Sequence, residues 1–255
     1  MSEPVILTEI DGAVAVVTLH RPESRNALNG ALRHAIPEAL MALDADPTVA
    51  AIILTGSDPA FCAGIDLREL SDAGSVASAD ASPLPFDAMS TPVIGAINGV
   101  TVTGGFELAL GCDFLIASER ARFADTHARV GVMPGWGLTV KLPQAIGIRR
   151  ARQMSFTGNF VDAPTALEWG LVNAVVSHDQ LIPTCKALAA DIASIPAANL
   201  AGIKNAYRTS GAPHDDAALA AEIGYSNDWL RQFDPATLAA SREAIQQRGR
   251  SQSES

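Results

Sequence analysis

The features of this sequence best suited to chemistry are two glycine-bearing turns and one nearby acid. Gly64 lies in the first turn, residues 61–67, and Gly104-Gly105 lie in the second, residues 98–107. Each turn stands where an apolar run typical of a strand gives way to a helical pattern, and the first N–H groups of a helix have no intrahelical partners. Two such amides directed at one point would stabilise an oxyanion. Glu107, one turn inside the second helix, is therefore a candidate general acid or base.

Each of these features also has a purely structural explanation. Glycine between a strand and a helix is required in many α/β proteins, and an acid near a helix start can simply offset the helix dipole. The sequence leaves both explanations open for either turn, and for Glu107, when each is taken singly.

The elements that would position these turns alternate between strands and helices. Asn29 is placed to cap a helix that extends through Leu43, in which Pro37 predicts a kink or a division into two pieces. Residues 71–85 are small and polar and predict a loop. Apolar, β-branched runs predict buried strands of a parallel sheet at 14–19, 50–55, 92–97 and 113–117.

Helical patterns dominate the chain after about residue 138. Alanine-rich helices are predicted at 179–195, 197–209 and 217–233, separated by Pro196 and by Gly211-Ala212-Pro213. The sequence therefore predicts an α/β fold with a helical C-terminal region, and we find no internal repeat in it.

Composition excludes several classes of protein. The 255 residues carry 18 Lys and Arg against 28 Asp and Glu, a net charge of −10, and 48% of the residues are hydrophobic. This hydrophobic content argues against disorder, and the acidic balance argues against nucleic acid as a partner. The three cysteines are widely spaced and form no disulfide or metal-binding pattern. No run approaches the roughly 20 apolar residues of a membrane span, so the cytoplasm is the expected location and no membrane is expected as a partner.

Taken in order, these motifs resemble those of the enoyl-CoA hydratase/isomerase (crotonase) superfamily. The resemblance extends from about residue 5 to about residue 210, and the rest of the chain matches poorly. It rests on the two glycine-bearing turns and on the landmarks His20-Arg21-Pro22, Arg25-Asn26-Ala27-Leu28, Ala121-Arg122-Phe123, Pro134-Gly135-Trp136-Gly137 and Ala166-Leu167-Glu168-Trp169-Gly170-Leu171-Val172.

The resemblance implies a crotonase-like spiral of ββα units over residues 1–200, followed by a helical region at 201–255 for trimerisation or as a lid. It implies a lyase that adds water reversibly to a 2-enoyl-CoA through an enolate, with fatty-acid β-oxidation as the metabolic setting. The implied partner is an acyl-CoA thioester substrate, and no cofactor or metal is implied, because backbone amides stabilise the enolate. The implied assembly is a homotrimer or a dimer of trimers.

The same resemblance assigns the site residues. The backbone N–H groups of Ile65 and Gly104 would form the oxyanion hole, and Glu107 would be one catalytic residue. Trp136 stands where the family usually has a small residue, so it would narrow the acyl pocket or be a core aromatic. Basic Arg25 and Arg68 would face the CoA phosphates. The substrate and CoA contacts as a whole would come from Arg25, Ala27, Ala63, Asp66, Leu67, Arg68, Gly135 and Trp136.

One position departs from the hydratase pattern. Hydratases use two carboxylates, and ungapped counting from Glu107 places the second at His127. A histidine also transfers protons near neutral pH, and Asp125 is placed to orient or charge it. The alternative is that His127 is a hydrogen-bonded pocket residue without a catalytic role. The departure leaves open double-bond isomerisation, decarboxylation or thioester hydrolysis, and also a non-catalytic acyl-CoA-binding protein.

Overall fold

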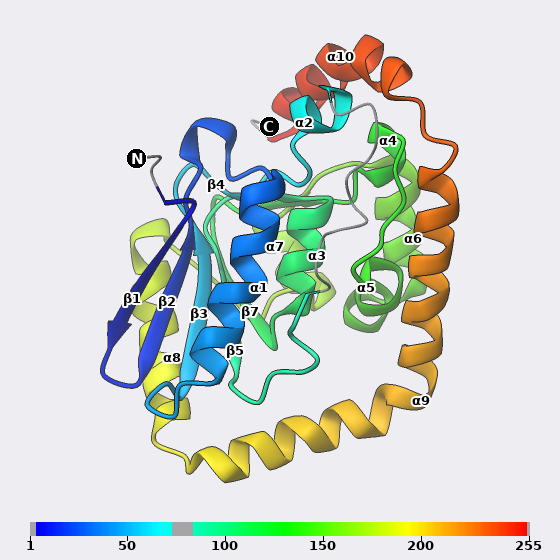
Figure 1. Cartoon of the computed structure of the whole chain (residues 1–255). Helices are drawn as coiled ribbons and strands as arrows, with labels where there is room; N and C mark the ends of the chain where they lie inside the picture. Colours follow the sequence, from blue (N-terminus) through cyan, green and yellow to red (C-terminus); the bar gives the residue numbers. More distant parts are fainter. Residues whose placement is uncertain (1–3, 73–83, 254–255) are drawn as a thin grey trace.

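Two β-sheets form the centre of the fold, and the computed structural model describes residues 4–72 and 84–253 of the chain (Figure 1). The larger sheet has six strands in the order β1-β2-β3-β5-β7-β10. The β1–β2 pair is antiparallel and the other neighbours are parallel. The predicted strands correspond to β2, β3, β5 and β7, whereas β1 and β10 lie outside the predictions. The six strands are β1 (Ile6–Asp11), β2 (Val14–Leu19), β3 (Ala51–Gly56), β5 (Val93–Ile97), β7 (Phe114–Ser118) and β10 (Ala174–Val176).

The smaller sheet consists of four short strands in the order β4-β6-β8-β9. These strands are β4 (Ala60–Cys62), β6 (Val100–Val102), β8 (Arg122–Ala124) and β9 (Val161–Asp162). In the chain, β4 follows β3, β6 follows β5 and β8 follows β7, and each pair leads into a helix. Each pair therefore places one strand in each sheet, and the fold is a spiral of ββα units. The unit repeats in the structure although the sequence shows no repeat.

The side chains of β2 show how the larger sheet is covered. Successive strand residues point to opposite faces. Ala15 and Val17 join the core cluster that contains residues of α1 (Gly30–Asp44) and α3 (Gly104–Gly111). Val14 and Val16 join the cluster formed with α8 (Leu181–Ala193), which packs against β2, β3, β5 and β7. The central strands β2, β3, β5 and β7 are therefore buried between helices on both faces, which explains their largely apolar sequences, whereas β1 at the edge is mostly exposed.

For the first long helix, α1, the sequence predicts the start correctly but not the effect of the proline inside it. Asn29 accepts a hydrogen bond from the N–H of Leu32 at 3.0 Å and caps α1 as expected. A division at Pro37 is wrong, because α1 is continuous through this buried residue. Tertiary packing of the helix face offsets the hydrogen bond that proline removes. The remaining helices are α2 (Leu67–Asp72), α4 (His127–Val130), α5 (Leu138–Ile146), α6 (Ile148–Thr157), α7 (Ala163–Trp169), α9 (Ala197–Leu230) and α10 (Pro235–Ser253), with single 3-10 turns at Pro22–Ser24 and His178–Gln180.

The C-terminal region is built from α9 and α10. A break at Gly211-Ala212-Pro213 is wrong, because α9 is helical from Ala197 to Leu230. Proline bends a helix without always ending it, and Figure 1 shows α9 following the lower edge of the molecule and then turning up its side. Residues 200 and 201, the predicted border of the core, lie within this helix. From its end the chain reaches α10, which packs against α2 and α4.

The predicted loop at 71–85 falls mainly on residues 73–83, which lie outside the described part of the chain. Residues 71 and 72 end α2. Among the described residues, no single helix has the length and apolar character to cross a membrane, and only the pair His178–Ala193 and Ala197–Ser210, bent by 104°, meets both criteria together.

Candidate active site

Three short parallel strands bring the candidate site residues together. β4, β6 and β8 are neighbours in the smaller sheet and point the same way, so their carboxyl ends meet at one edge. Gly64-Ile65 follow β4, Thr103-Gly104 follow β6, and residues 125–127 follow β8. The glycine-bearing turns therefore follow strands of the smaller sheet. The apolar runs at 50–55 and 92–97, which were expected to lead directly into the turns, form β3 and β5. A short strand, β4 or β6, stands between each run and its turn.

Glu107, His127 and Asp125 form one buried chain of polar side chains. Oε2 of Glu107 lies 3.3 Å from Nε2 of His127, and Nδ1 of His127 lies 2.7 Å from Oδ1 of Asp125. Asp125 also accepts a hydrogen bond from the backbone N–H of His127 at 3.2 Å. The three side chains are only 3–4% exposed. Asp125 thus fixes the orientation of the imidazole, as expected from its spacing, and turns Nε2 toward Glu107.

The two acids determine the charge of His127. Burial alone would lower the pKa of the imidazole, but the charge of Glu107 and the hydrogen bond to Asp125 outweigh burial and raise this pKa from 6.5 to about 9. Burial also opposes ionisation of Asp125, yet its contact with His127 holds the pKa of this carboxyl below the usual value. At neutral pH His127 is therefore an imidazolium that lies between two acids.

The other oxygen of Glu107 is held by the main chain. Oε1 accepts hydrogen bonds from the backbone N–H groups of Gly135 at 3.1 Å and of Trp136 at 2.7 Å. Gly135 and Trp136, which the resemblance places at the substrate, thus contact Glu107 through their amides. α3 reaches this position because Gly105 has no side chain: a Cβ there would lie 2.3 Å from the carbonyl oxygen of Cys62 on β4. Both carboxylate oxygens of Glu107 therefore have fixed partners.

Gly104, which carries one candidate oxyanion amide, packs against the side chains of Trp136 and of Ile65, which carries the other. A Cβ placed on Gly104 would lie 3.4 Å from the ring of Trp136 and 3.9 Å from Cγ1 of Ile65. Ile65 forms a parallel bridge with Leu28, in which the donors are the N–H groups of Leu28 and Asp66. Among the hydrogen bonds of the described residues, none is donated by the backbone N–H of Ile65 or Gly104. Both amides are therefore available to a ligand.

Thr103 connects the start of α3 to the start of α4. Its backbone has φ 54° and ψ −124°, and its carbonyl accepts a hydrogen bond from the N–H of Glu107 at 3.0 Å. Its hydroxyl pairs with the hydroxyl of Thr126, the residue before His127. The turn that carries Gly104 and the helix that carries Glu107 are therefore fixed relative to the segment that carries His127.

Most residues predicted to contact CoA lie on two adjacent segments, the loop before α1 and the segment that leads from β4 into α2. The loop before α1 carries Arg25, whose carbonyl accepts a hydrogen bond from the N–H of Ala63 at 3.0 Å. Leu67 opens α2, and Arg68 follows it. The side chains of Arg25 and Arg68 are exposed. Arg25 therefore lies on a segment bonded to Ala63, and Arg68 lies five residues after Ala63 at the start of α2.

Arg21 is a site residue that the sequence analysis missed. Two of its guanidinium nitrogens lie 3.1 Å from Oδ2 of Asp66, and it also donates a hydrogen bond to the carbonyl of Ala27. Arg21 therefore ties together two of the predicted CoA-contact residues, and the carboxylate of Asp66 is already paired. The signal was present in the landmark His20-Arg21-Pro22, but only the fold brings Arg21 to Asp66.

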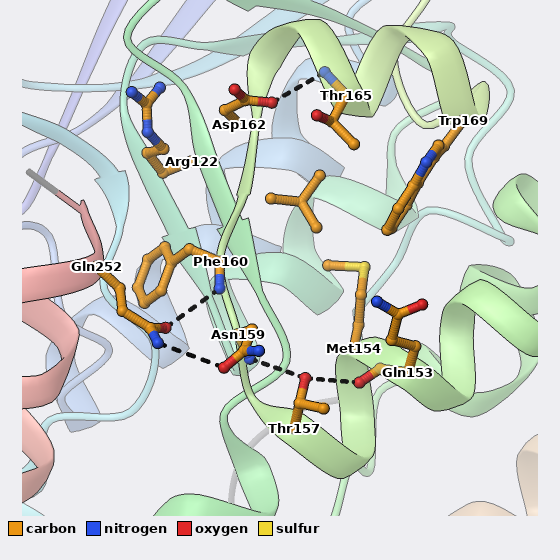
Figure 2. Close-up of a pocket in the computed structure, with 11 residues that line it drawn as sticks. Arg122, Gln153, Met154, Thr157, Asn159, Phe160, Asp162, Thr165, Trp169 and Gln252 are labelled. Carbon is orange, nitrogen blue, oxygen red and sulfur yellow. Dashed lines mark hydrogen bonds between the residues drawn. The ribbon is translucent and has the colours of Figure 1, made fainter. Parts of the chain in front are cut away.

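A cavity of about 390 Å³ lies at a different place, between α6, α7 and the end of α10 (Figure 2). Arg122 and Trp169 are among the residues that line it. Gln252 of α10 accepts a hydrogen bond from the N–H of Phe160 at 3.4 Å and donates one to Asn159 at 3.3 Å, as Figure 2 shows. The residues that line it include neither Glu107, His127 and Asp125 nor any residue of the two glycine-bearing turns. This cavity is therefore separate from the candidate active site.

The cysteines and the other possible metal ligands among the described residues form no metal site. Within the described ranges, no three side chains of His, Cys, Asp or Glu are grouped to hold a metal ion. The three cysteines are free and buried. Burial raises the pKa of the Cys62 thiol to about 12, so the cysteine beside the first turn is a neutral thiol at physiological pH.

Comparisons with known proteins show the family to which this chain belongs. A family model described as "Enoyl-CoA hydratase/isomerase" matches residues 9–235, which extends beyond the sequence landmarks. The chain is 40% identical over 181 residues to "Probable enoyl-CoA hydratase 1, peroxisomal" of Arabidopsis thaliana, covering 70% of this chain and 68% of that protein. It is 39% identical over 204 residues to a probable enoyl-CoA hydratase of Mycobacterium bovis, covering 77% and 78%. The crystal structure of an enoyl-CoA hydratase from Mycobacterium smegmatis matches with a TM-score of 0.83 and 46% identity, covering 91% of this chain and 100% of that one.

Proposed function

The chain belongs to the enoyl-CoA hydratase/isomerase family, and on this basis we propose that Glu107 and His127 together add water to the double bond of a 2-enoyl-CoA thioester. The observation that carries the proposal is the 3.3 Å contact between Oε2 of Glu107 and Nε2 of His127. Water must lose a proton as its oxygen bonds to Cβ, and Cα must gain one. An acid side chain that accepts a proton beside an imidazolium that donates one meets both needs.

The thioester oxygen binds to the backbone N–H groups of Ile65 and Gly104. Negative charge develops on this oxygen when the electron pair of the double bond moves toward the carbonyl. Two donors fixed in advance stabilise that charge without reorganisation, and removal of one such donor typically costs on the order of 10²–10³ in rate. Because these amides receive the developing charge, the step needs no cofactor.

The proton transfers close into a cycle. Glu107 removes a proton from water while the water oxygen forms its bond to Cβ, and the π electrons move to the thioester oxygen as an enolate. The enolate collapses as Cα takes a proton from Nε2 of His127. Glu107, now protonated, returns its proton to the neutral imidazole across the 3.3 Å contact. One water has been added, and both side chains have regained their starting protonation.

Asp125 suits this cycle because it keeps His127 charged at the start. Its hydrogen bond to Nδ1, at 2.7 Å, leaves Nε2 as the nitrogen that faces Glu107. A histidine without such acids would be mostly neutral at pH 7 to 8 and could not protonate Cα. The replacement of the second hydratase carboxylate by His127 is thus compatible with hydration.

The exposed side chains of Arg25 and Arg68 are suited to the CoA phosphates, because exposed guanidinium groups bind phosphate oxygens strongly. Main-chain atoms of Ala27, Ala63 and Leu67 complete this region. The Arg21–Asp66 pair holds its loops in place. Trp136, half-buried against the core beside Gly104, limits the space for the acyl chain and favours short substrates.

The proposal is tested by incubating the purified protein with crotonyl-CoA and following the enone absorbance and the mass of the thioester. We expect loss of the absorbance and a mass gain of one water. Glu107→Gln should lower the rate by at least ~10³-fold, because it removes the proton acceptor, whereas binding of the thioester should persist. Glu9→Gln, on an exposed strand, is the matched control and should have no effect.

Other outcomes would contradict hydration in distinct ways. An unchanged mass with an altered spectrum indicates isomerisation, loss of carbon dioxide indicates decarboxylation, and release of free CoA indicates thioester hydrolysis. Binding without any change over hours indicates an acyl-CoA-binding protein.

We further propose a homotrimer or dimer of trimers that acts in the cytoplasm on fatty-acid intermediates. Exposed apolar side chains on α9, including Ile203, Tyr207 and Tyr225, support an assembly through this region. The three free cysteines suit a reducing compartment. Light scattering after size-exclusion chromatography tests the assembly, and cell fractionation tests the location.

A further inference from the structure

Glu222 is a buried carboxylate of α9 that binds the start of α5. It is only 6% exposed. Its Oε1 accepts a hydrogen bond from the N–H of Gly137 at 2.6 Å, and its Oε2 accepts one from the N–H of Thr139 at 2.6 Å and one from the Thr139 hydroxyl. Gly137 has φ 102° and no side chain, so α5 begins without a cap of its own. Glu222 takes the place of that cap and interacts favourably with the helix dipole.

The same short stretch of backbone also holds Glu107. The amides of Gly135 and Trp136 point to Oε1 of Glu107, and the amides of Gly137 and Thr139 point to Glu222. Four amides within residues 135–139 are thus divided between two buried carboxylates. A displacement of this backbone away from Glu222 would also move the two amides that hold Glu107.

We propose that Glu222 is a positioning residue for Glu107, acting through the backbone of residues 135–139. By anchoring the start of α5, it keeps the amides of Gly135 and Trp136 on one oxygen of Glu107 and leaves the other oxygen directed at His127. Misplacement of a catalytic group by about 1 Å costs up to about 10²-fold in rate. This inference rests on the proposed hydration for its kinetic readout, but the geometry can also be measured without it.

Two other α9 side chains bind the loop that precedes residue 135, and one of them, Trp229, offers a matched control. Ser226 donates a hydrogen bond to the carbonyl of Met133 at 3.3 Å, and Nε1 of Trp229 donates one to the carbonyl of Gly131 at 2.8 Å. Both hydrogen bonds hold the preceding part of the same loop, but Ser226 also packs against Gly135, whereas the hydrogen bond of Trp229 involves neither Glu107 nor the start of α5. Trp229→Phe therefore removes an α9 hydrogen bond to the loop and leaves the Glu222 contacts in place.

The kinetic experiment compares Glu222→Gln with Trp229→Phe, well below the unfolding temperature of each. Glutamine keeps the shape but presents an NH₂ group to one of the donors, so we expect kcat to fall about 10-fold with KM within about twofold. Trp229→Phe should change neither. In a Glu107→Asp background, whose shorter side chain no longer reaches the two amides, Glu222→Gln should have less than about a twofold effect. A purely structural role predicts the same loss in both backgrounds and would overturn the proposal.

Hydrogen exchange supplies a readout independent of activity. In Glu222→Gln, the amides of residues 135–139 should exchange faster than in the wild type, and in Trp229→Phe they should not. Unchanged exchange, or an unchanged kcat in a wild type that hydrates crotonyl-CoA, contradicts the role of Glu222. A wild type that binds crotonyl-CoA but does not hydrate it contradicts the proposed function instead, and faster exchange in Glu222→Gln would still support the positioning role.

Discussion

The two oxygens of Glu107 face two regions of the molecule that differ in kind. Oε2 faces His127 and Asp125, two side chains on one short segment after β8. Oε1 faces backbone amides, and the loop that carries them is anchored by Glu222, which lies 85 residues from Gly137 in the sequence. The first region supplies titratable groups, and the second supplies backbone amides that fix the position of the Glu107 carboxylate. Substitutions in the first should therefore change protonation and its pH dependence, whereas those in the second should change geometry alone.

The strongest test of this difference is His127→Gln. Glutamine keeps polar contacts with both acids but cannot donate a proton to Cα, so we expect kcat to fall on the order of 10²–10³-fold. His34→Gln, at an exposed position on α1, is the control and should retain full activity. Equal rates and superimposable pH–rate profiles for His127→Gln and the wild type would show that His127 is a structural pocket residue.

Stability should depend on pH through the same region. The folded pKa of His127 is about 9, above the unfolded value of 6.5. Its contribution is therefore complete below pH 6.5 and is lost as the pH rises to about 9. A shift of this size corresponds to about 3 kcal/mol in the free energy of unfolding. Denaturant unfolding at pH 6.5 and 9 should show this loss in the wild type and not in His127→Gln. An equal loss in both proteins would assign it to other groups.

Asp125→Asn tests whether the second acid acts by setting the charge of His127. Asparagine can still accept the hydrogen bond from Nδ1 but carries no charge, so the pKa of His127 should fall from about 9 toward 6.5. We expect a loss of roughly 10-fold in kcat at pH 8 and an alkaline limb of the pH–rate profile at lower pH. Asp46→Asn, at an exposed turn, should leave the profile unchanged. A loss of rate without a shift of the limb would limit Asp125 to orientation.

The smallest effect is expected at Trp136, whose main chain belongs to the second region and whose ring lies beside Gly104. Trp136→Leu keeps the amide that holds Glu107 and opens space for the acyl chain. We expect kcat/KM to rise about fivefold for an eight-carbon enoyl-CoA relative to crotonyl-CoA. Trp169→Leu, at the separate cavity, should not alter this ratio. No change in the ratio for Trp136→Leu would place the ring in the core.

The sequence predicts the first region better than the second. The spacing of Asp125 and His127 puts both on one segment, so their contact follows from local geometry. The anchoring of Glu107 by residues 135 and 136 depends on how α3, α5 and α9 pack. No local sequence pattern predicts these contacts. Glu222 was missed because its contacts with Gly137 and Thr139 depend on the same packing, and because it lies beyond the family landmarks.

The two sheets show the same contrast for the fold. β3, β5 and β7 are predicted because each is a run of five or six mostly apolar residues that are largely buried between helices. β4, β6 and β8 have three residues each, too few for a periodic signal, and they are recognised only from their pairing with one another in the fold. The strands that carry the active-site turns are thus the ones that pattern analysis misses.

The backbone of Thr103 has a cost that the folded protein must offset. A β-branched residue at φ 54° is held in a conformation that residues other than glycine rarely adopt, which typically costs on the order of 1–3 kcal/mol. The rest of the structure supplies that energy to fix the turn from which the amide of Gly104 reaches the site. A substitution that relaxes this turn would remove that cost and displace the amide of Gly104, so we expect it to raise stability and lower activity.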